Sequence, residues 1–213
     1  MAERLGAGQS EAPKSLETES RKKPVILIMG AEGSGKSTQA YLLAQRYNLP
    51  TIVMGEEFRE LAENDTTELG AECKRMLDAG QYSSDELFER VFDSRFSKED
   101  VKRGVVVDGV FRTTGQVEST KELIQRYIGD ADITVVFLRS PIWEGASRAM
   151  QRSGTYDTEE RILSRQGFFF KDLGRRVSLI KNYFRFIQIT TFNKSVEKVQ
   201  EEIIRKYEEV AIN

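Results

Sequence analysis

The chain has 213 residues, of which 39% are hydrophobic and 31% are charged, and its formal net charge is −2 at pH 7. That length is enough for one domain with a well-filled core, and the near balance of acids and bases argues against nucleic acid as a partner. No apolar run approaches the ~18 residues that a membrane span needs, so we expect no membrane association. The chain contains no histidine, which removes the commonest general base and the commonest zinc ligand.

The single cysteine, Cys73, excludes an intramolecular disulfide and indicates a reducing compartment, so we expect a cytoplasmic protein. Cys73 lies in a segment of helical pattern, where a lone cysteine is more often a small buried hydrophobe than a nucleophile. Residues 1–23 are polar, contain several acids and lack the apolar core of a signal peptide. We therefore expect a disordered tail at 1–23 and one domain over 24–213.

Short apolar runs alternate with longer amphipathic ones over the rest of the chain. The apolar runs predict strands at 25–29, 51–54, 104–108, 133–138 and 186–190. The amphipathic segments predict helices at 36–47, 56–63, 68–79, 84–95, 115–128, 141–152, 158–183 and 194–208. Because the strands are apolar on both faces and alternate with helices, we predict an α/β fold, which the glycine motif described below makes one of the P-loop NTPase type. Its parallel five-stranded sheet would have helices on both faces.

Three predicted helices, rather than one, separate the second strand from the third. This excess predicts a helical subdomain inserted at about 54–96. A polar break, SGTYD at 153–157, separates two further helices near the middle of the second half of the chain. No internal repeat is evident.

The strongest motif follows the first predicted strand. Residues 30–38 read GAEGSGKST, which fits G-x-x-x-x-G-K-[ST]. Glycines let successive backbone N–H groups point at phosphate oxygens, and the helix that follows adds its positive N-terminal end. In such a P-loop the lysine reaches the β- and γ-phosphates, and the serine hydroxyl contacts Mg²⁺. The candidate ATP-binding residues of the loop are Gly30, Gly33, Ser34, Gly35, Lys36, Ser37 and Thr38.

Further segments resemble the adenylate kinases and related nucleoside monophosphate kinases. They are GAEGSGKSTQA (30–40), MGEEFR (54–59), DAGQYSSDEL (78–87), DGVFRTTGQ (108–116) and EERILSR (159–165). They occur in the family's order and in one register over about 24–205. The resemblance implies transfer of the γ-phosphate of Mg-ATP to a nucleoside monophosphate, with a helical monophosphate-binding insertion and a short lid at about 148–165.

The resemblance also implies roles on the acceptor side. Arg59 and Arg112 would bind the acceptor's phosphate, which suits the planar fork of arginine. Gln116 would pair with the edge of the acceptor base. The remaining candidate acceptor-binding residues are Met54, Gly55 and Gly109.

On the donor side, the resemblance places Arg148 against the ATP base and lets Arg152 reach the ATP phosphates. Arg165 would close on the migrating phosphoryl group. Asp108 would hold Mg²⁺ through water, together with Ser37. The candidate catalytic residues are thus Lys36, Arg112, Arg152 and Arg165.

Several positions depart from the family pattern. Met54 stands where a threonine is usual, and in the lid Thr155 stands in place of an arginine. Arg161, one helical turn before Arg165, is a candidate replacement for that missing cation. Gln116 favours AMP as the acceptor, but a UMP/CMP-type or other small-acceptor kinase remains open. So does a nucleotide-binding sensor or partner protein with weakened catalysis. We expect ATP and a nucleoside monophosphate as ligands, and a monomer.

Overall fold

The structure, a computed structural model, describes residues 22–151 and 158–211. The predicted tail at 1–23 lies almost wholly outside these residues, and the first strand already begins at Lys23. The predicted polar break at 153–157 also lies outside them. Within the described ranges, no helix combines the length and the apolar character that crossing a membrane requires.

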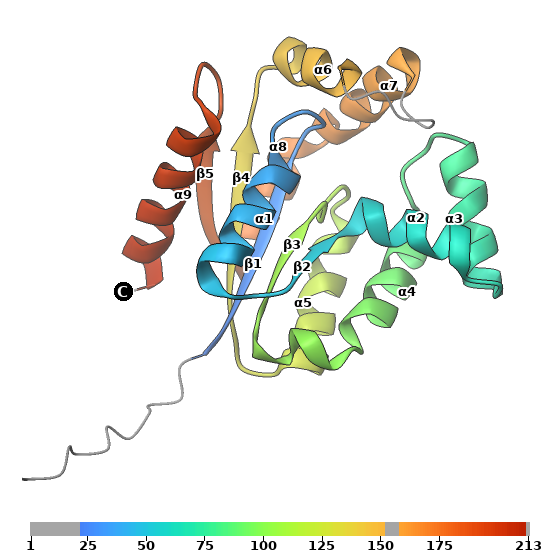
Figure 1. The fold of residues 1–213 in the computed structure, drawn as a ribbon, viewed down its shortest axis with the longest axis horizontal. Coiled ribbons are helices and arrows are strands. Elements are labelled where there is room, and N and C mark those ends of the chain that lie inside the picture. The colour runs from blue at the N-terminus through green and yellow to red at the C-terminus, as the bar shows by residue number, and fades with distance from the viewer. Residues whose placement is uncertain (1–21, 152–157, 212–213) are drawn as a thin grey trace, which may run out of the picture.

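The strands form a single parallel sheet (Figure 1). They are β1 (Lys23–Gly30), β2 (Thr51–Val53), β3 (Val105–Asp108), β4 (Ala131–Arg139) and β5 (Arg185–Thr190). Their order across the sheet is β2-β3-β1-β4-β5. The predicted fold class is therefore confirmed. β1 lies between β3 and β4, so the chain order reverses beside it, and ligands of open α/β sheets bind in the crevice at such a reversal.

Helices follow the strands at nearly the predicted positions. They are α1 (Lys36–Tyr47), α2 (Met54–Asn64), α3 (Glu68–Asp78), α4 (Asp85–Phe96), α5 (Gly115–Ile128), α6 (Ile142–Met150), α7 (Glu159–Phe170), α8 (Leu173–Tyr183) and α9 (Val196–Ala211). A short 3₁₀ helix, η1 (Glu99–Arg103), was not predicted. Its five residues are too few to show a helical period in sequence.

Both faces of the sheet are buried, as strands apolar on both faces predict. In β1, Val25, Leu27 and Met29 face a core that includes side chains of α2 to α5, α7 and α8. Ile26 and Ile28 face a second core, which side chains of α1 and α9 complete. All five side chains are fully buried, and each such burial stabilises the fold by about 1.5–3 kcal/mol.

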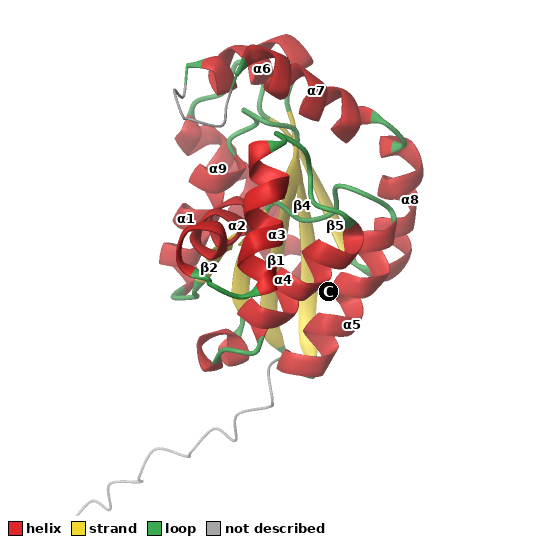
Figure 2. Ribbon diagram, turned by 90° about the vertical axis from the view of Figure 1, so that its right-hand side faces the viewer, coloured by secondary structure: helices red, strands yellow, loops and turns green. Residues whose placement is uncertain are grey.

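Helices α2, α3 and α4 occupy the long connection between β2 and β3 and lie beside one another (Figure 2). Two of them begin at side-chain caps: Thr67 Oγ1 accepts from Leu69 N, and Ser84 Oγ accepts from Leu87 N. Cys73 is fully buried within α3, and burial raises the pKa of its thiol to about 11. The expectation that Cys73 is a small buried hydrophobe is confirmed.

The prediction of a single helix over 158–183 is wrong, because the chain forms two helices, α7 and α8, with a break at Lys171 and Asp172. Asp172 has a φ of +56°, in the left-handed region that aspartate tolerates better than most residues. The apolar pattern of Phe168 to Phe170, Leu173 and Val177 continues across the break, so periodicity alone predicts no interruption there.

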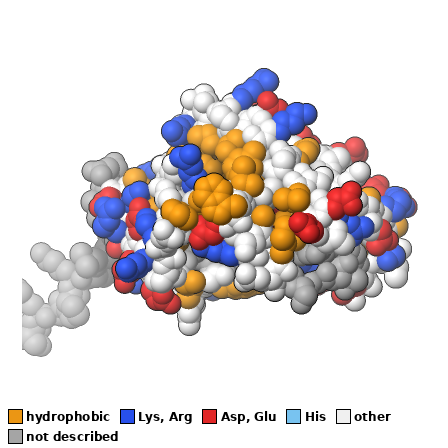
Figure 3. Space-filling model, turned by 90° about the horizontal axis from the view of Figure 1, so that it is seen from above, with side chains coloured by type: hydrophobic (Ala, Val, Ile, Leu, Met, Phe, Trp, Pro, Cys, Tyr) orange, Lys and Arg blue, Asp and Glu red, His pale blue; other side chains and the backbone are white. Residues whose placement is uncertain are grey.

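Exposed hydrophobic side chains gather over the carboxyl edge of the sheet, as the view from above shows (Figure 3). Trp143 of α6 is 71% exposed, and its ring meets the Phe192 ring edge-on, at 6.4 Å between centroids. Ile142 and Val196 are about half exposed. Gln39 Nε2 donates to Val196 O at 3.0 Å, which ties this surface to the first helix after the P-loop.

Candidate active site

The P-loop leaves β1 at the carboxyl edge of the sheet and runs into α1. Gly33 and Gly35 have φ values of +73° and +91°, which glycine adopts without steric cost. α1 begins at Lys36 and has no acidic residue in its first turn. The positive end of the helix dipole is therefore not offset by a neighbouring carboxylate of the same turn.

Two glycines bring the P-loop against α6. A Cβ atom added to Gly33 would lie 1.9 Å from Gly145 O, and one added to Gly145 would lie 2.6 Å from Glu32 O. The two main chains therefore touch at a distance that only glycine permits. This contact sets Arg148 of α6 beside the loop, where it donates to Gly33 O at 3.4 Å and pairs with Glu144.

The hydroxyl of Ser37 and the carboxylate of Asp108 form a hydrogen bond next to Lys36. Ser37 Oγ donates to Asp108 Oδ2 at 2.5 Å, and Asp108 is only 3% exposed at the end of β3. Its Oδ1 atom is buried and has no hydrogen-bond partner among the described residues. Lys36 Nζ lies nearby in the same pocket and donates to Ala31 O at 2.9 Å. Buried oxygens of this kind fit Mg²⁺, which takes one or two protein ligands and completes its shell with phosphates and water.

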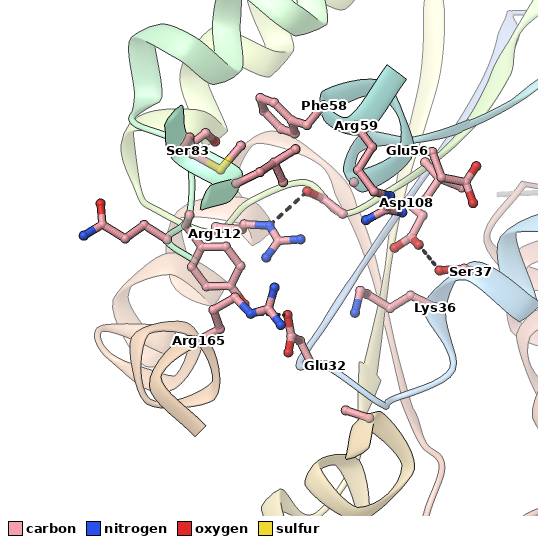
Figure 4. Close-up of a pocket in the computed structure, with 18 of the residues that line it drawn as sticks. Glu32, Lys36, Ser37, Glu56, Phe58, Arg59, Ser83, Asp108, Arg112 and Arg165 are labelled. Carbon is pink, nitrogen blue, oxygen red and sulfur yellow. Dashed lines mark hydrogen bonds and ion pairs between the residues drawn. The ribbon is translucent and has the colours of Figure 1, made fainter. Parts of the chain in front are cut away.

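A pocket of about 620 Å³ opens beside this pair. Figure 4 shows Lys36, Arg59, Arg112 and Arg165 extending into it. These four cations come from α1, α2, the loop after β3 and α7, which are far apart in sequence. Four carboxylates, of Glu32, Glu56, Glu63 and Asp108, also line the pocket, so it is the convergence of three guanidinium forks and Lys36, rather than an excess of positive charge, that suits a phosphate ligand.

Arg112 is fixed from several sides. Its backbone N donates to Gln116 Oε1 at 2.9 Å, and its Nε donates to Gly109 O at 3.4 Å. Its guanidinium lies over the Tyr82 ring, 4.0 Å from the centroid. Its carbonyl oxygen accepts from Arg176 Nη1 at 2.7 Å. Such an arginine loses little further conformational entropy when it binds a ligand.

Arg165 pairs with an acid of the P-loop itself. Its Nε lies 2.9 Å from Glu32 Oε1, and both side chains are more than four-fifths buried. The carboxylate offsets part of the positive charge around the pocket. Figure 4 shows the pair at the pocket wall beside Lys36.

Not every predicted residue reaches the pocket. Gln116 is fully buried beneath Arg112, with its Oε1 occupied, while its Nε2 has no hydrogen-bond partner among the described residues. Met54 is 1% exposed and belongs to the core. Arg152 lies outside the described residues. Arg161, the candidate replacement cation, donates to Asp78 O at 2.7 Å and does not line the pocket.

The remaining predicted residues lie in or next to the pocket. Gly33, Gly55 and Gly109 line it. The residues that belong to the P-loop or the first turn of α1 without lining the pocket are Gly30, Ser34, Gly35 and Thr38.

Sequence reasoning missed three residues that shape the site. Glu32 occupies an unspecified position of the P-loop motif, so the motif gives no signal for it. Tyr82 lies in DAGQYSSDEL (78–87), a segment that the resemblance covers without giving Tyr82 a role. Arg176 lies on a helix with an ordinary amphipathic pattern and gave none.

The fold and the loop at 30–38 together define a P-loop nucleotide-binding protein, and four cations line the pocket beside that loop. A family model described as adenylate kinase matches residues 28–186. The chain belongs to the adenylate kinase family.

Individual relatives agree with this assignment. The adenylate kinase of Clavibacter michiganensis subsp. michiganensis is 30% identical over 84% of this chain and 90% of its own length. That of Mycolicibacterium paratuberculosis is 37% identical over 66% of this chain and 76% of its own. That of Francisella philomiragia subsp. philomiragia is 43% identical over 46% of this chain and 45% of its own.

Proposed function

We propose that this chain catalyses ATP + AMP = 2 ADP with Mg²⁺, as a nucleoside monophosphate kinase. The observation that supports this most is the meeting of Lys36, Arg59, Arg112 and Arg165 in one pocket beside the P-loop. Phosphoryl transfer needs in-line positioning and charge neutralisation more than acid–base groups. A chain without histidine is therefore suited to this reaction.

On the donor side, we assign the P-loop amides and Lys36 to the ATP phosphates, and Arg148 to the ATP base. Ser37 and Asp108 would hold Mg²⁺, largely through water, and the metal when bound would neutralise charge on the phosphates. Within the described residues no three acids or cysteines are arranged so that they could hold a metal ion together, so nucleotide and water would supply its other ligands.

On the acceptor side, we assign Arg59 and Arg112 to the AMP phosphate and Arg165 to the phosphoryl group in flight. The choice of AMP is supported by the relatives named above, which are adenylate kinases, whereas Gln116 is buried away from the pocket and lends it no support. We further propose that 54–96 closes over AMP and 148–165 over ATP, excluding water so that ATP is not hydrolysed.

The test is a coupled assay with Mg-ATP and, in turn, AMP, GMP, CMP, UMP and dTMP, using Lys36→Ala as the blank. We expect turnover with AMP above all others, absent from the blank. If the enzyme preferred UMP or CMP, that nucleotide would replace AMP as the proposed acceptor. Tight ATP binding by calorimetry without turnover of any acceptor would overturn it in favour of a nucleotide sensor.

Replacing Asp108 with asparagine should raise the Mg²⁺ concentration that gives half-maximal activity by about 10- to 100-fold, as loss of a metal-orienting group does. Asparagine keeps an oxygen that accepts from Ser37 but removes the negative charge. The measurement is initial rate against free Mg²⁺ at saturating nucleotides. Asp130→Asn, at an exposed surface aspartate, is the control. An unchanged Mg²⁺ dependence would remove Asp108 from the metal site.

We also propose that the protein is a cytoplasmic monomer that does not bind nucleic acid. Its net charge of −2 supports the last point, since such partners select a basic face. Gel filtration with light scattering would test the oligomeric state directly.

A further inference from the structure

Arg176 is buried to a degree unusual for arginine. It lies on α8, is 2% exposed, and is among the largest fully buried side chains of the described residues. Its Nη1 donates to Arg112 O at 2.7 Å and to Lys171 O at 3.4 Å, and its Nη2 donates to Phe169 O. Its hydrogen-bond acceptors in the described part of the chain are thus main-chain carbonyls.

Burying a charge whose hydrogen bonds all go to carbonyl oxygens costs free energy, because the charge loses its hydration. Burial lowers the pKa of Arg176 to about 10, so the group stays protonated at neutral pH. A buried charge incurs a desolvation cost that a neutral hydrogen-bond donor would largely avoid. Satisfying these carbonyls therefore does not by itself require a charged arginine.

Helix capping explains only part of the contact. Phe169 and Lys171 lie at the end of α7, where carbonyls lack partners within the helix, and an arginine can satisfy them. The third bond reaches Arg112, which is 64 residues away in sequence. One rigid guanidinium fork thus joins the end of α7, the helix that contains Arg165, to the loop that contains Arg112.

The ring contacts around these residues extend the same connection. The Arg176 guanidinium lies 4.9 Å from the Phe169 ring centroid. On the other side of Arg112, the Tyr82 ring packs on the Arg112 guanidinium and lies 5.2 Å from the Phe168 ring. The main chain of Arg112 is therefore linked to α7 through Arg176, and its side chain is linked to α7 through Tyr82.

We propose that Arg176 is a positioning residue that fixes Arg112 and α7 in one frame, so that Arg112 and Arg165 meet the acceptor and the migrating phosphoryl group together. The inference rests on the proposed function. Arg176 does not line the pocket itself and acts through the Arg112 main chain. Arg176 bonds directly to the Arg112 main chain, but it reaches the P-loop only through α7 and the Arg165–Glu32 pair, so we expect ATP binding to depend on Arg176 much less than AMP binding does.

The experiment compares Arg176→Met, which keeps an unbranched apolar stem but removes the donors, with Arg176→Lys, which keeps one charged donor group. Arg175→Met, at the exposed neighbouring arginine on α8, is the matched control. We expect Arg176→Met to lower kcat/KM for AMP by about 10- to 100-fold, as expected when a charged hydrogen bond that aligns a reacting group is lost. KM for ATP should stay within about twofold of wild type. Arg176→Lys should recover part of the loss, and Arg175→Met should match wild type.

Equal losses for ATP and AMP, or a lowered Tm with kcat/KM for AMP unchanged at 25 °C, would overturn the proposal and leave Arg176 a structural residue. If Arg176→Met does not fold, Arg176→Lys decides by the same AMP-to-ATP comparison. Wild-type turnover of AMP tests the proposed function on its own. The ratio of variant to wild type tests this inference, so the two failures are distinguishable.

Discussion

Replacing Lys36 with methionine is expected to lower kcat/KM by about 10³-fold or more, since it removes a preorganised cation from the transferring phosphoryl group. Methionine retains a chain of similar length, and the glycines of the P-loop still shape the anion site. Nucleotide binding should therefore weaken much less than turnover. The measurement is the coupled assay with AMP, together with calorimetric titration of ATP.

The control for Lys36→Met is Lys198→Met, at an exposed lysine on α9, which should leave the rate unchanged. Because Lys36 Nζ hydrogen-bonds to Ala31 O, the variant also needs a thermal unfolding curve. A rate within tenfold of wild type in a folded Lys36→Met protein would show that the P-loop amides suffice and that Lys36 is not a catalytic residue.

Arg165→Ala is expected to lower kcat by about 10³-fold, which is the range for a cation that acts on a transferring phosphoryl group. Because the group would act mainly in the transition state, KM for ATP and for AMP should change far less than kcat. Single-turnover measurements with both nucleotides saturating would separate the chemical step from product release.

Arg161→Ala is the matched control for Arg165→Ala, since both arginines lie on α7. The Arg161 guanidinium donates to Asp78 O and does not line the pocket, so we expect its kcat within about twofold of wild type. If Arg161→Ala instead lost as much activity as Arg165→Ala, Arg161 would act in the reaction and would have to leave Asp78 during closure.

The sheet and most helices could be predicted from the sequence because their signals are local. The doubly apolar run of β1 and the glycine motif at 30–38 depend only on neighbouring residues. The break between α7 and α8 could not be predicted in this way. At this break Arg176 donates to carbonyls at the end of α7, a tertiary contact without a periodic signature.

The cations of the site were predicted through resemblance, whereas their partners were not. A motif gives the type of residue, but not the carbonyl or ring that a side chain meets. Gln116 shows the difference: its position in DGVFRTTGQ implied a contact with the base, while its Oε1 accepts from Arg112 N. Glu32 shows it again, because the motif leaves unspecified the position whose carboxylate pairs with Arg165.

The contact between Gly33 and Gly145 limits how this sequence can diverge. A side chain at either position would collide with the main chain of the other segment, so a single substitution of either glycine would not be tolerated. A compensating change would have to move α6, and Arg148 with it. The two glycines therefore constrain each other during divergence. Adaptation of the donor site to another nucleotide has to occur in the side chains around them.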